Sequence, residues 1–307
     1  MHLAEGVLPL SHAAGWGVLA APTLLWSIRG ERAHRDAPMS SVVMAGVTSL
    51  LFAVTLLPLP VPVVGATSHI CLTPVLSLVV GVRRIVWPTF FILLLQALFF
   101  AHGGLTTLGV NTLTLGLLGP LVTVALWSVL RRLGMANALG LACACGLGGL
   151  SVYVADAIVL AAALTDAAPP LTTFVAVLLG FVPVQVPLAV LESVASVSIV
   201  KLISKRRAEL LPPSLRTLRG ASAPSSATAL LLLLTIGLSG CSYEGIDGTV
   251  FGVTAESAGR PPTESAIDLS QGELGLGMTI VILFGLGFLA GRSWERLFGN
   301  GRHAIPR

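Results

Sequence analysis

Three of the six histidines lie in or beside the apolar segments of a very hydrophobic chain, where ionisable residues are uncommon: His2, His69 and His102. Their imidazole nitrogens suit late first-row divalent metals. Because His2 directly follows Met1, the free amine of Met1, the backbone nitrogen of His2 and its imidazole could chelate one ion in fused rings. A fourth nitrogen, best supplied by His69, would complete a square, the geometry that suits Ni²⁺ or Cu²⁺. Mg²⁺ and Ca²⁺ are excluded because they prefer oxygen ligands.

This chelate requires Met1 to be the terminus of the mature chain. The opening residues have no basic n-region and no small-residue cleavage site of the kind that marks a signal peptide. A residue as bulky as His2 should also block removal of the initiator methionine. We therefore expect a free amine on Met1.

Other polar residues accompany the three histidines, and we expect them around the metal ligands: Glu5, Thr67, Ser68 and Asn111. Each feature also has a plainer interpretation. His69 could satisfy backbone groups at a helix start, and His102 could cap a helix C-terminus, where a cation is favoured. The stretch "GGLTTLG" could be a contact between membrane helices, which small residues favour. Residue types alone leave both interpretations open.

The composition predicts an all-α polytopic membrane protein. Of the 307 residues, 54% are hydrophobic and only 10% are charged, against about 25% charged in soluble domains. No basic patch suits a nucleic acid, and the expected surroundings are a lipid bilayer. Placing the basic clusters in the cytoplasm gives about nine spans, with the N-terminus outside and the C-terminus cytoplasmic, in a cell (inner or plasma) membrane. The expected spans are 11–28, 40–58, 69–82, 85–101, 110–130, 136–163, 171–200, 226–241 and 275–291.

The chain divides into a core and an appended module. We expect a seven-helix metal-binding core over 1–205 and a cytoplasmic linker over 206–225, where basic residues, proline and serine gather. Residues 226–307 then form a two-span transmembrane hairpin around a polar, acidic loop placed outside the cell.

"MHLAEGVLP", "GATSH" and above all "LLLQALFFAHGGLTTLGVNTLTLGLLGP" resemble the CbiM/NikM family, over residues 1 to about 205. Its members are substrate-capture (S) components of energy-coupling factor transporters, which are of the ABC type, for cobalt and nickel. "FVPVQVPLAVLESVASVSIV", which contains Glu192, is similar to the family's seventh helix. The C-terminal hairpin resembles the family's two-span CbiN/NikN subunit in layout.

The resemblance implies a near-planar set of nitrogens from Met1, His2 and His69 around the metal. It implies that His102 and Asn111 orient the N-terminal segment, which Glu5 would hold in place. The chain departs from many relatives in "ICLTP" after His69 and in Ser193 after Glu192, and these departures bear on the loop behind His69 and so on the choice of metal.

The function expected from these observations is that of an S component that imports Ni²⁺ or Co²⁺, the metal being the transported substrate. The chain has no G-x-x-x-x-G-K-[ST] motif, so ATP hydrolysis would fall to separate ATPase subunits, coupled through a transmembrane (T) subunit. A stand-alone divalent-metal permease or channel is the main alternative. An intramembrane metalloenzyme is a second, although the chain has neither H-E-x-x-H nor a second carboxylate near the histidines. The sequence does not decide between nickel and cobalt.

Overall fold

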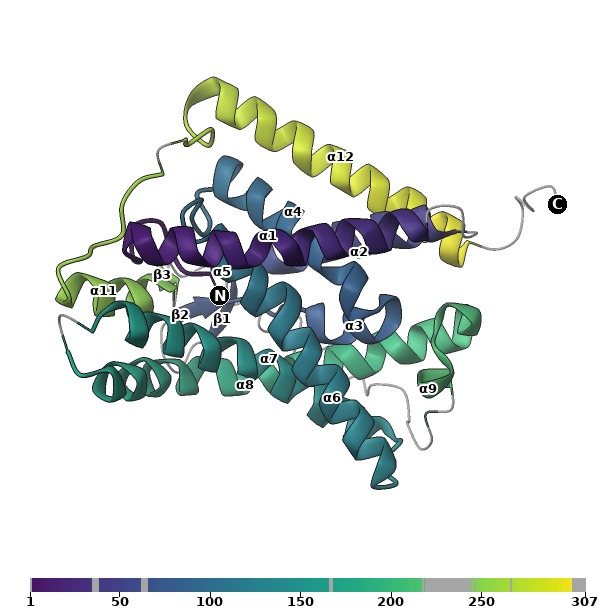
Figure 1. Ribbon diagram of the computed structural model, residues 1–307. Coiled ribbons are helices and arrows are strands. Elements are labelled where there is room, and N and C mark those ends of the chain that lie inside the picture. Colours follow the sequence, from purple (N-terminus) through teal and green to yellow (C-terminus); the bar gives the residue numbers. More distant parts are fainter. Residues whose placement is uncertain are drawn as a thin grey trace.

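The computed structural model describes residues 2–34, 39–61, 66–165, 168–216, 218, 244–245, 247–265 and 267–299 (Figure 1). Long α-helices make up most of the fold. The long helices are α1 (Leu10–Ala33), α2 (Ser40–Leu56), α4 (Val82–Phe99), α6 (Gly119–Arg132), α7 (Ala138–Ala163), α8 (Pro170–Arg206) and α12 (Gly272–Phe298). The shorter ones are α3 (Thr73–Val80), α5 (Leu108–Asn111), α9 (Pro213–Arg216) and α11 (Val253–Ser257). A π-helix, η1 (Thr112–Leu118), joins α5 and α6 into one continuous helix, and two further short turns of helix are η2 (Ala208–Leu210) and η3 (Asp247–Gly252).

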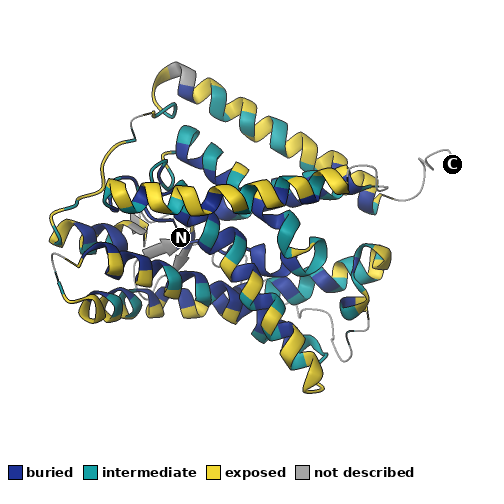
Figure 2. Ribbon diagram, viewed as in Figure 1, coloured by how far each residue is buried: buried dark blue, intermediate teal, exposed yellow. Residues whose placement is uncertain are grey.

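This is a multi-pass membrane protein. Five helices are long and apolar enough to cross a bilayer, and α2 is a slightly shorter apolar helix; the five are Val82–Phe99, Leu108–Arg132, Ala138–Ala163, Pro170–Arg206 and Gly275–Phe298. The predicted span 226–241 lies outside the described residues, so the count of nine stays a prediction. Figure 2 shows α12 mostly exposed, with Phe284 and Phe288 among its exposed side chains. In a membrane protein such an apolar surface faces lipid.

The predicted span 69–82 contains only the eight-residue helix α3. At about 1.5 Å per residue, this helix is far shorter than the roughly 30 Å hydrocarbon core. Leu72 before it and Gly81 after it both have positive φ, 56° and 93°, which interrupts the helix on each side. Residues 69–72 therefore approach α3 as a buried, non-helical turn.

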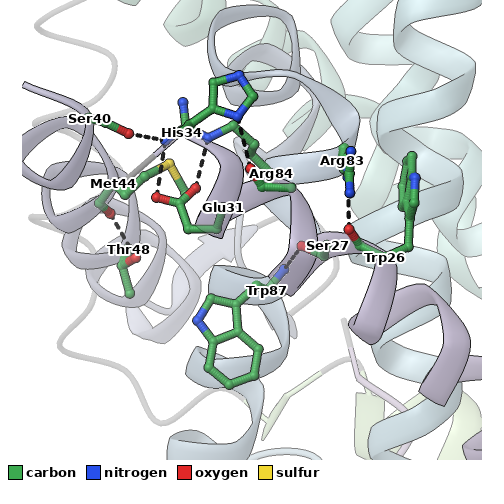
Figure 3. A network of polar contacts seen from close by, with 11 residues as sticks. Trp26, Ser27, Glu31, His34, Ser40, Met44, Thr48, Arg83, Arg84 and Trp87 are labelled. Carbon is green, nitrogen blue, oxygen red and sulfur yellow. Dashed lines mark hydrogen bonds and ion pairs between the residues drawn. The ribbon is translucent and has the colours of Figure 1, made fainter. Parts of the chain in front are cut away.

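A polar network fixes one end of the helix bundle (Figure 3). Arg84 at the start of α4 donates through Nε to Glu31 of α1 at 2.7 Å and through Nη2 to Ser40 of α2 at 2.7 Å. Beside it, the Nε of Arg83 donates to the carbonyl of Trp26 at 2.8 Å. The last turns of α1 thus lie against the first turn of α4. Because α1 and α4 pack together, the start of α1 and the end of α4 meet at the opposite end of the bundle.

A small sheet lies at that opposite end. Strands β1 (Leu59–Val61) and β2 (Ala66–Ser68) pair antiparallel, with Leu59 opposite Ser68. Strand β3 (Glu244–Gly245) joins β2 in parallel. These short strands are the only ones among the described residues.

The C-terminal module packs on the core at several points. Phe251 is fully buried, and its ring lies 4.5 Å from that of Phe181 on α8. Part of the loop predicted as polar and external is therefore folded onto the core, because it carries apolar side chains that find a partner there. Helix α12 packs along α2, where Gly46 of α2 faces Ser293 of α12.

Candidate metal centre

Three segments that are far apart in sequence bring His2, His69 and His102 together. His2 lies ahead of α1, His69 directly follows β2, and His102 follows α4. Each ring offers one nitrogen such that the three nitrogens lie within 4.8 Å of one another. The ring of His2 is stacked on that of His69, with centroids 5.1 Å apart and an interplanar angle of 29°. The ring of His102 meets His2 edge-on, at 4.6 Å and 89°.

The ring of His2 is buried without the hydrogen bonds that a buried polar group normally has. Its exposed fraction is 1%, and neither ring nitrogen hydrogen-bonds to any described residue. Burial lowers the pKa of His2 well below 6.5, and the neighbouring His102 lowers the pKa further. A buried polar group without partners costs free energy, and a neutral imidazole is the form that binds metals. These two properties fit a metal ligand.

His69 is held in an orientation suited to the same purpose. It is 3% exposed, and its Nδ1 lies 3.3 Å from the carbonyl oxygen of Ile70. With the proton on Nδ1 donated to this carbonyl, Nε2 carries the lone pair that a metal needs. A backbone carbonyl bonded to the second ring nitrogen is the usual way to fix the tautomer of a metal-binding histidine.

The segment that carries His2 is held by a side-chain amide on the continuous helix that begins at α5. The backbone N–H of Leu3 donates to Oδ1 of Asn111 at 3.0 Å, and Nδ2 of Asn111 donates to the carbonyl of Leu3 at 3.2 Å. The hydroxyl of Thr107 donates to the same carbonyl at 2.5 Å and accepts from Nδ2 of Asn111 at 3.2 Å. Asn111 thus pairs with Leu3 as a neighbouring strand would, and Thr107 completes the contact.

Glu5 makes the next contact along the segment. The backbone N–H of Thr106 donates to Oε2 of Glu5 at 3.1 Å. A Cβ added at Gly104 would come within 2.6 Å of the Glu5 backbone nitrogen. Gly103 has a φ of +83° and lies beside His2. The two glycines after His102 therefore let the chain pass close to the N-terminal segment.

Residues of the C-terminal module cover the outer side of the same segment. The N–H of Thr263 donates to the carbonyl of Glu5 at 3.0 Å, and the hydroxyl of Ser265 reaches Oε2 of Glu5 at 3.3 Å. Arg260 donates to the carbonyl of Leu8 at 3.2 Å. The N-terminal segment therefore lies between the loop after α4 and the C-terminal module.

The structure brings several of the residues expected at the site close together. The structure gathers His2, His69, His102, Asn111 and Glu5, and Ser68 accepts a hydrogen bond of 2.9 Å from Gln185. Met1 lies outside the described residues, as does the side chain of Thr67. Thr107, Gln185 and Ser265 are not among the residues expected from the sequence pattern, which assigns no role to Glu192. Thr107 precedes Asn111 by four positions, a spacing that puts both residues on one helix face. This spacing is the signal that points to Thr107.

The family model described as "Cobalt uptake substrate-specific transmembrane region", CbiM, matches residues 2–210, which is more than half of the chain. The chain belongs to the CbiM family. A cobalt transport protein CbiM of Geobacter sulfurreducens is 34% identical over 98% of this chain and 91% of its own length. A second one, from Sorangium cellulosum, is 37% identical over 69% of this chain and 94% of its own length.

Solved structures support the fold. A crystal structure described as a transition metal transporter superposes with a TM-score of 0.56 at 20% identity, covering 68% of this chain and 96% of that one. A truncated transition metal transporter gives 0.55, also at 20% identity, over 67% of this chain and 99% of that one. The Geobacter CbiM protein aligns with nearly the whole chain and so with the C-terminal module too, whereas the family model ends at residue 210.

Proposed function

We propose that this chain is the metal-binding S component of an energy-coupling factor transporter, an ABC-type importer, and that it imports Co²⁺. The observation that carries the proposal is the buried ring of His2, which lies beside the rings of His69 and His102 without a hydrogen bond to any described residue. Membership of the CbiM family supports cobalt. The ion is the transported substrate and not a resident cofactor.

The ligands in this proposal are the amine of Met1, the backbone nitrogen and imidazole of His2, and the imidazole of His69. Two features support the set. The rings of His2 and His69 lie against each other and offer nitrogens within 4.8 Å of one another, and Asn111 and Thr107 hydrogen-bond the backbone of Leu3, directly after His2. His102 orients the ring of His2 from its edge.

Other groups hold the ligands in place. Glu5, through the backbone of Thr106, keeps the N-terminal segment folded into the bundle. Thr67 and Ser68 lead into His69 from strand β2. Outer groups of this kind orient the ligands of metal sites and typically change affinity about 10- to 100-fold when they are removed.

Ni²⁺ is the second candidate substrate, because four nitrogens in a square suit it. Selectivity between the two metals is not set by the affinity order alone. Competition between ⁵⁷Co²⁺ and unlabelled Ni²⁺ for the purified protein measures the preference directly. Displacement of Co²⁺ by an equimolar amount of Ni²⁺ would reverse our assignment.

Transport in this proposal requires partners. A transmembrane T subunit would couple the chain to cytoplasmic ATPase subunits, since the sequence has no G-x-x-x-x-G-K-[ST] motif for binding ATP phosphates. The N-terminus faces the outside and the C-terminus the cytoplasm, so the site loads from outside. The core spans 1–205, the linker 206–225, and the hairpin module 226–307.

The test is metal uptake by cells that produce the chain with its T and ATPase subunits. ⁵⁷Co²⁺ should accumulate with intact ATPases and stay at background when the ATP-binding lysines of the ATPases are replaced. A stand-alone permease would lower a Co²⁺ gradient across vesicles that contain this chain only, without nucleotide. Such leakage, or uptake that survives loss of the ATPases, would contradict the proposal.

A further inference from the structure

Helix α8 presents two buried polar side chains to the turn that carries His69. Gln185 is 2% exposed and Glu192 is 3% exposed. They are seven positions apart, which is two helical turns, so they lie on the same side of α8. Polar groups within membrane helices are expensive and commonly mark a functional site. The surrounding positions of α8 are mostly apolar, so these two residues need an explanation.

The two side chains bind the backbone region on both sides of His69. Nε2 of Gln185 donates to the hydroxyl oxygen of Ser68 at 2.9 Å. The backbone N–H of Leu72 donates to Oε1 of Glu192 at 2.9 Å, and a second backbone hydrogen bond to this carboxylate comes from Cys71. Positions 68 and 71–72 are thus both tied to α8, and His69 lies between them.

The turn at 69–72 is buried in the core and has an unusual backbone conformation. Leu72 has a φ of +56°, in the left-handed region that a leucine rarely adopts. Leu72 is also the N-cap residue of α3, and its side chain makes no capping hydrogen bond to that helix. The carboxyl group of Glu192 accepts the hydrogen bond of the Leu72 N–H next to the start of α3.

Helix α7 is shaped to accept this carboxylate. A Cβ added at Gly149 would lie 2.8 Å from Oε2 of Glu192. The neighbouring Ser193 makes different contacts, since its hydroxyl lies within hydrogen-bond distance of the carbonyl oxygens of Ala142 and Ala189 in α7 and α8. The expected influence of Ser193 on the loop behind His69 has no hydrogen bond to carry it among the described contacts. Ser193 is therefore a matched control, one position along the same helix.

We propose that Glu192 and Gln185 are positioning residues that hold the turn 69–72 from its two ends and thereby place His69 for metal binding. The consequence for metal binding depends on the proposed function, whereas the bracing of the turn does not. The two parts are therefore tested by separate measurements.

The first measurement needs no metal. Cys71 lies within the braced turn and is fully buried, so its thiol reports on the turn. In a full-length chain with Cys143, Cys145 and Cys241 replaced by alanine, the rate at which a maleimide labels Cys71 is followed by mass spectrometry. We expect Glu192→Ala to raise the labelling rate at least tenfold and Ser193→Ala to leave it unchanged. Equal rates in the parent and in a folded Glu192→Ala variant would overturn the brace.

The second measurement uses Cu²⁺ as a probe, because its electron paramagnetic resonance spectrum reports the nitrogens around the ion. Glu192→Ala and Gln185→Ala should shift the spectrum of the native chain toward that of His69→Ala, with a 10- to 100-fold loss of affinity. Ser193→Ala should keep the native spectrum. A native spectrum and affinity in the Glu192 and Gln185 variants would contradict their role in placing His69.

Glu192→Gln covers the case in which Glu192→Ala does not fold. The amide keeps the volume and one carbonyl acceptor but replaces the second acceptor oxygen with a donor, so we expect labelling and metal affinity between those of the parent and Glu192→Ala. Values equal to the parent's would show that the carboxylate is not needed. If the native chain binds no Cu²⁺ or Co²⁺ at all, the proposed function fails. The labelling result still decides whether Glu192 and Gln185 hold the turn.

Discussion

Asn111→Ala is the change that most directly tests how the N-terminal segment is held. In the native chain Asn111 is 2% exposed and pairs with both backbone groups of Leu3. Alanine leaves the Leu3 carbonyl with the hydroxyl of Thr107, but the Leu3 N–H loses its partner within a buried site. A stranded donor costs about 1–3 kcal/mol.

This cost falls on the folded-in position of the segment, because only there is the N–H of Leu3 buried against the helix. If metal binding requires that position, the affinity should drop by a factor of about 5 to 150, since about 1.4 kcal/mol corresponds to tenfold. Asn111→Asp should do no better, since it keeps the acceptor for the Leu3 N–H but turns a second oxygen toward the Leu3 carbonyl. The Kd for Co²⁺ is measured by calorimetry on tag-free protein in lipid nanodiscs.

Thr112→Val is the matched control, because the hydroxyl of Thr112 bonds only the carbonyl of Leu108 in its own helix among the described contacts. It should bind Co²⁺ as the native chain does. The reasoning is refuted if folded Asn111→Ala, with a Tm close to that of the control, binds Co²⁺ with native affinity.

Three further predictions concern the surroundings of the ion. His2→Ala and His69→Ala should abolish stoichiometric Co²⁺ binding, whereas His102→Ala should lower the affinity about 10- to 100-fold. Metal analysis after gel filtration separates these outcomes. Loss of binding in all three variants would make His102 a ligand. Gly104→Ala should displace the N-terminal segment, since its Cβ would lie 2.6 Å from a backbone nitrogen of that segment. We therefore expect ⁵⁷Co²⁺ to dissociate faster from this variant. A dissociation rate equal to that of the native chain would count against the close contact between Gly104 and the segment. Ser265→Ala removes one hydrogen bond of 3.3 Å to Glu5. It should raise the Kd for Co²⁺ about two- to tenfold, in line with about 0.5–1.5 kcal/mol for such a bond. An unchanged Kd would mean that this contact does not stabilise the metal-bound state.

The histidines could be found from the sequence because the topology places them together. His2, His69 and His102 were expected on one side of the membrane, and the structure gathers them at one end of the bundle. Helices also lie where most of the hydrophobic runs predict them. Hydropathy alone could not show that α3 has only eight residues, because positive φ angles at Leu72 and Gly81 interrupt the helix without interrupting the apolar run.

The contacts of Glu192 and Gln185 with the turn could not be predicted from the sequence, for a different reason. Glu192 and Gln185 act on a turn more than a hundred positions away, and helix periodicity says which face they share but not what lies opposite. Thr263 and Ser265 lie in a polar stretch without periodicity, so nothing in their pattern pointed to Glu5. The domain boundaries and the two-span layout of the C-terminal module stay predictions.

The most direct test of the central claim is Co²⁺ binding by the chain with its native, tag-free N-terminus, beside a variant with one alanine inserted between Met1 and His2. The insertion leaves every side chain in the protein but separates the terminal amine from the imidazole of His2. We predict one tightly bound Co²⁺ per native chain and no stoichiometric binding in the variant. Equal binding by both would show that the chain terminus is not a ligand, and the account of the site would be wrong.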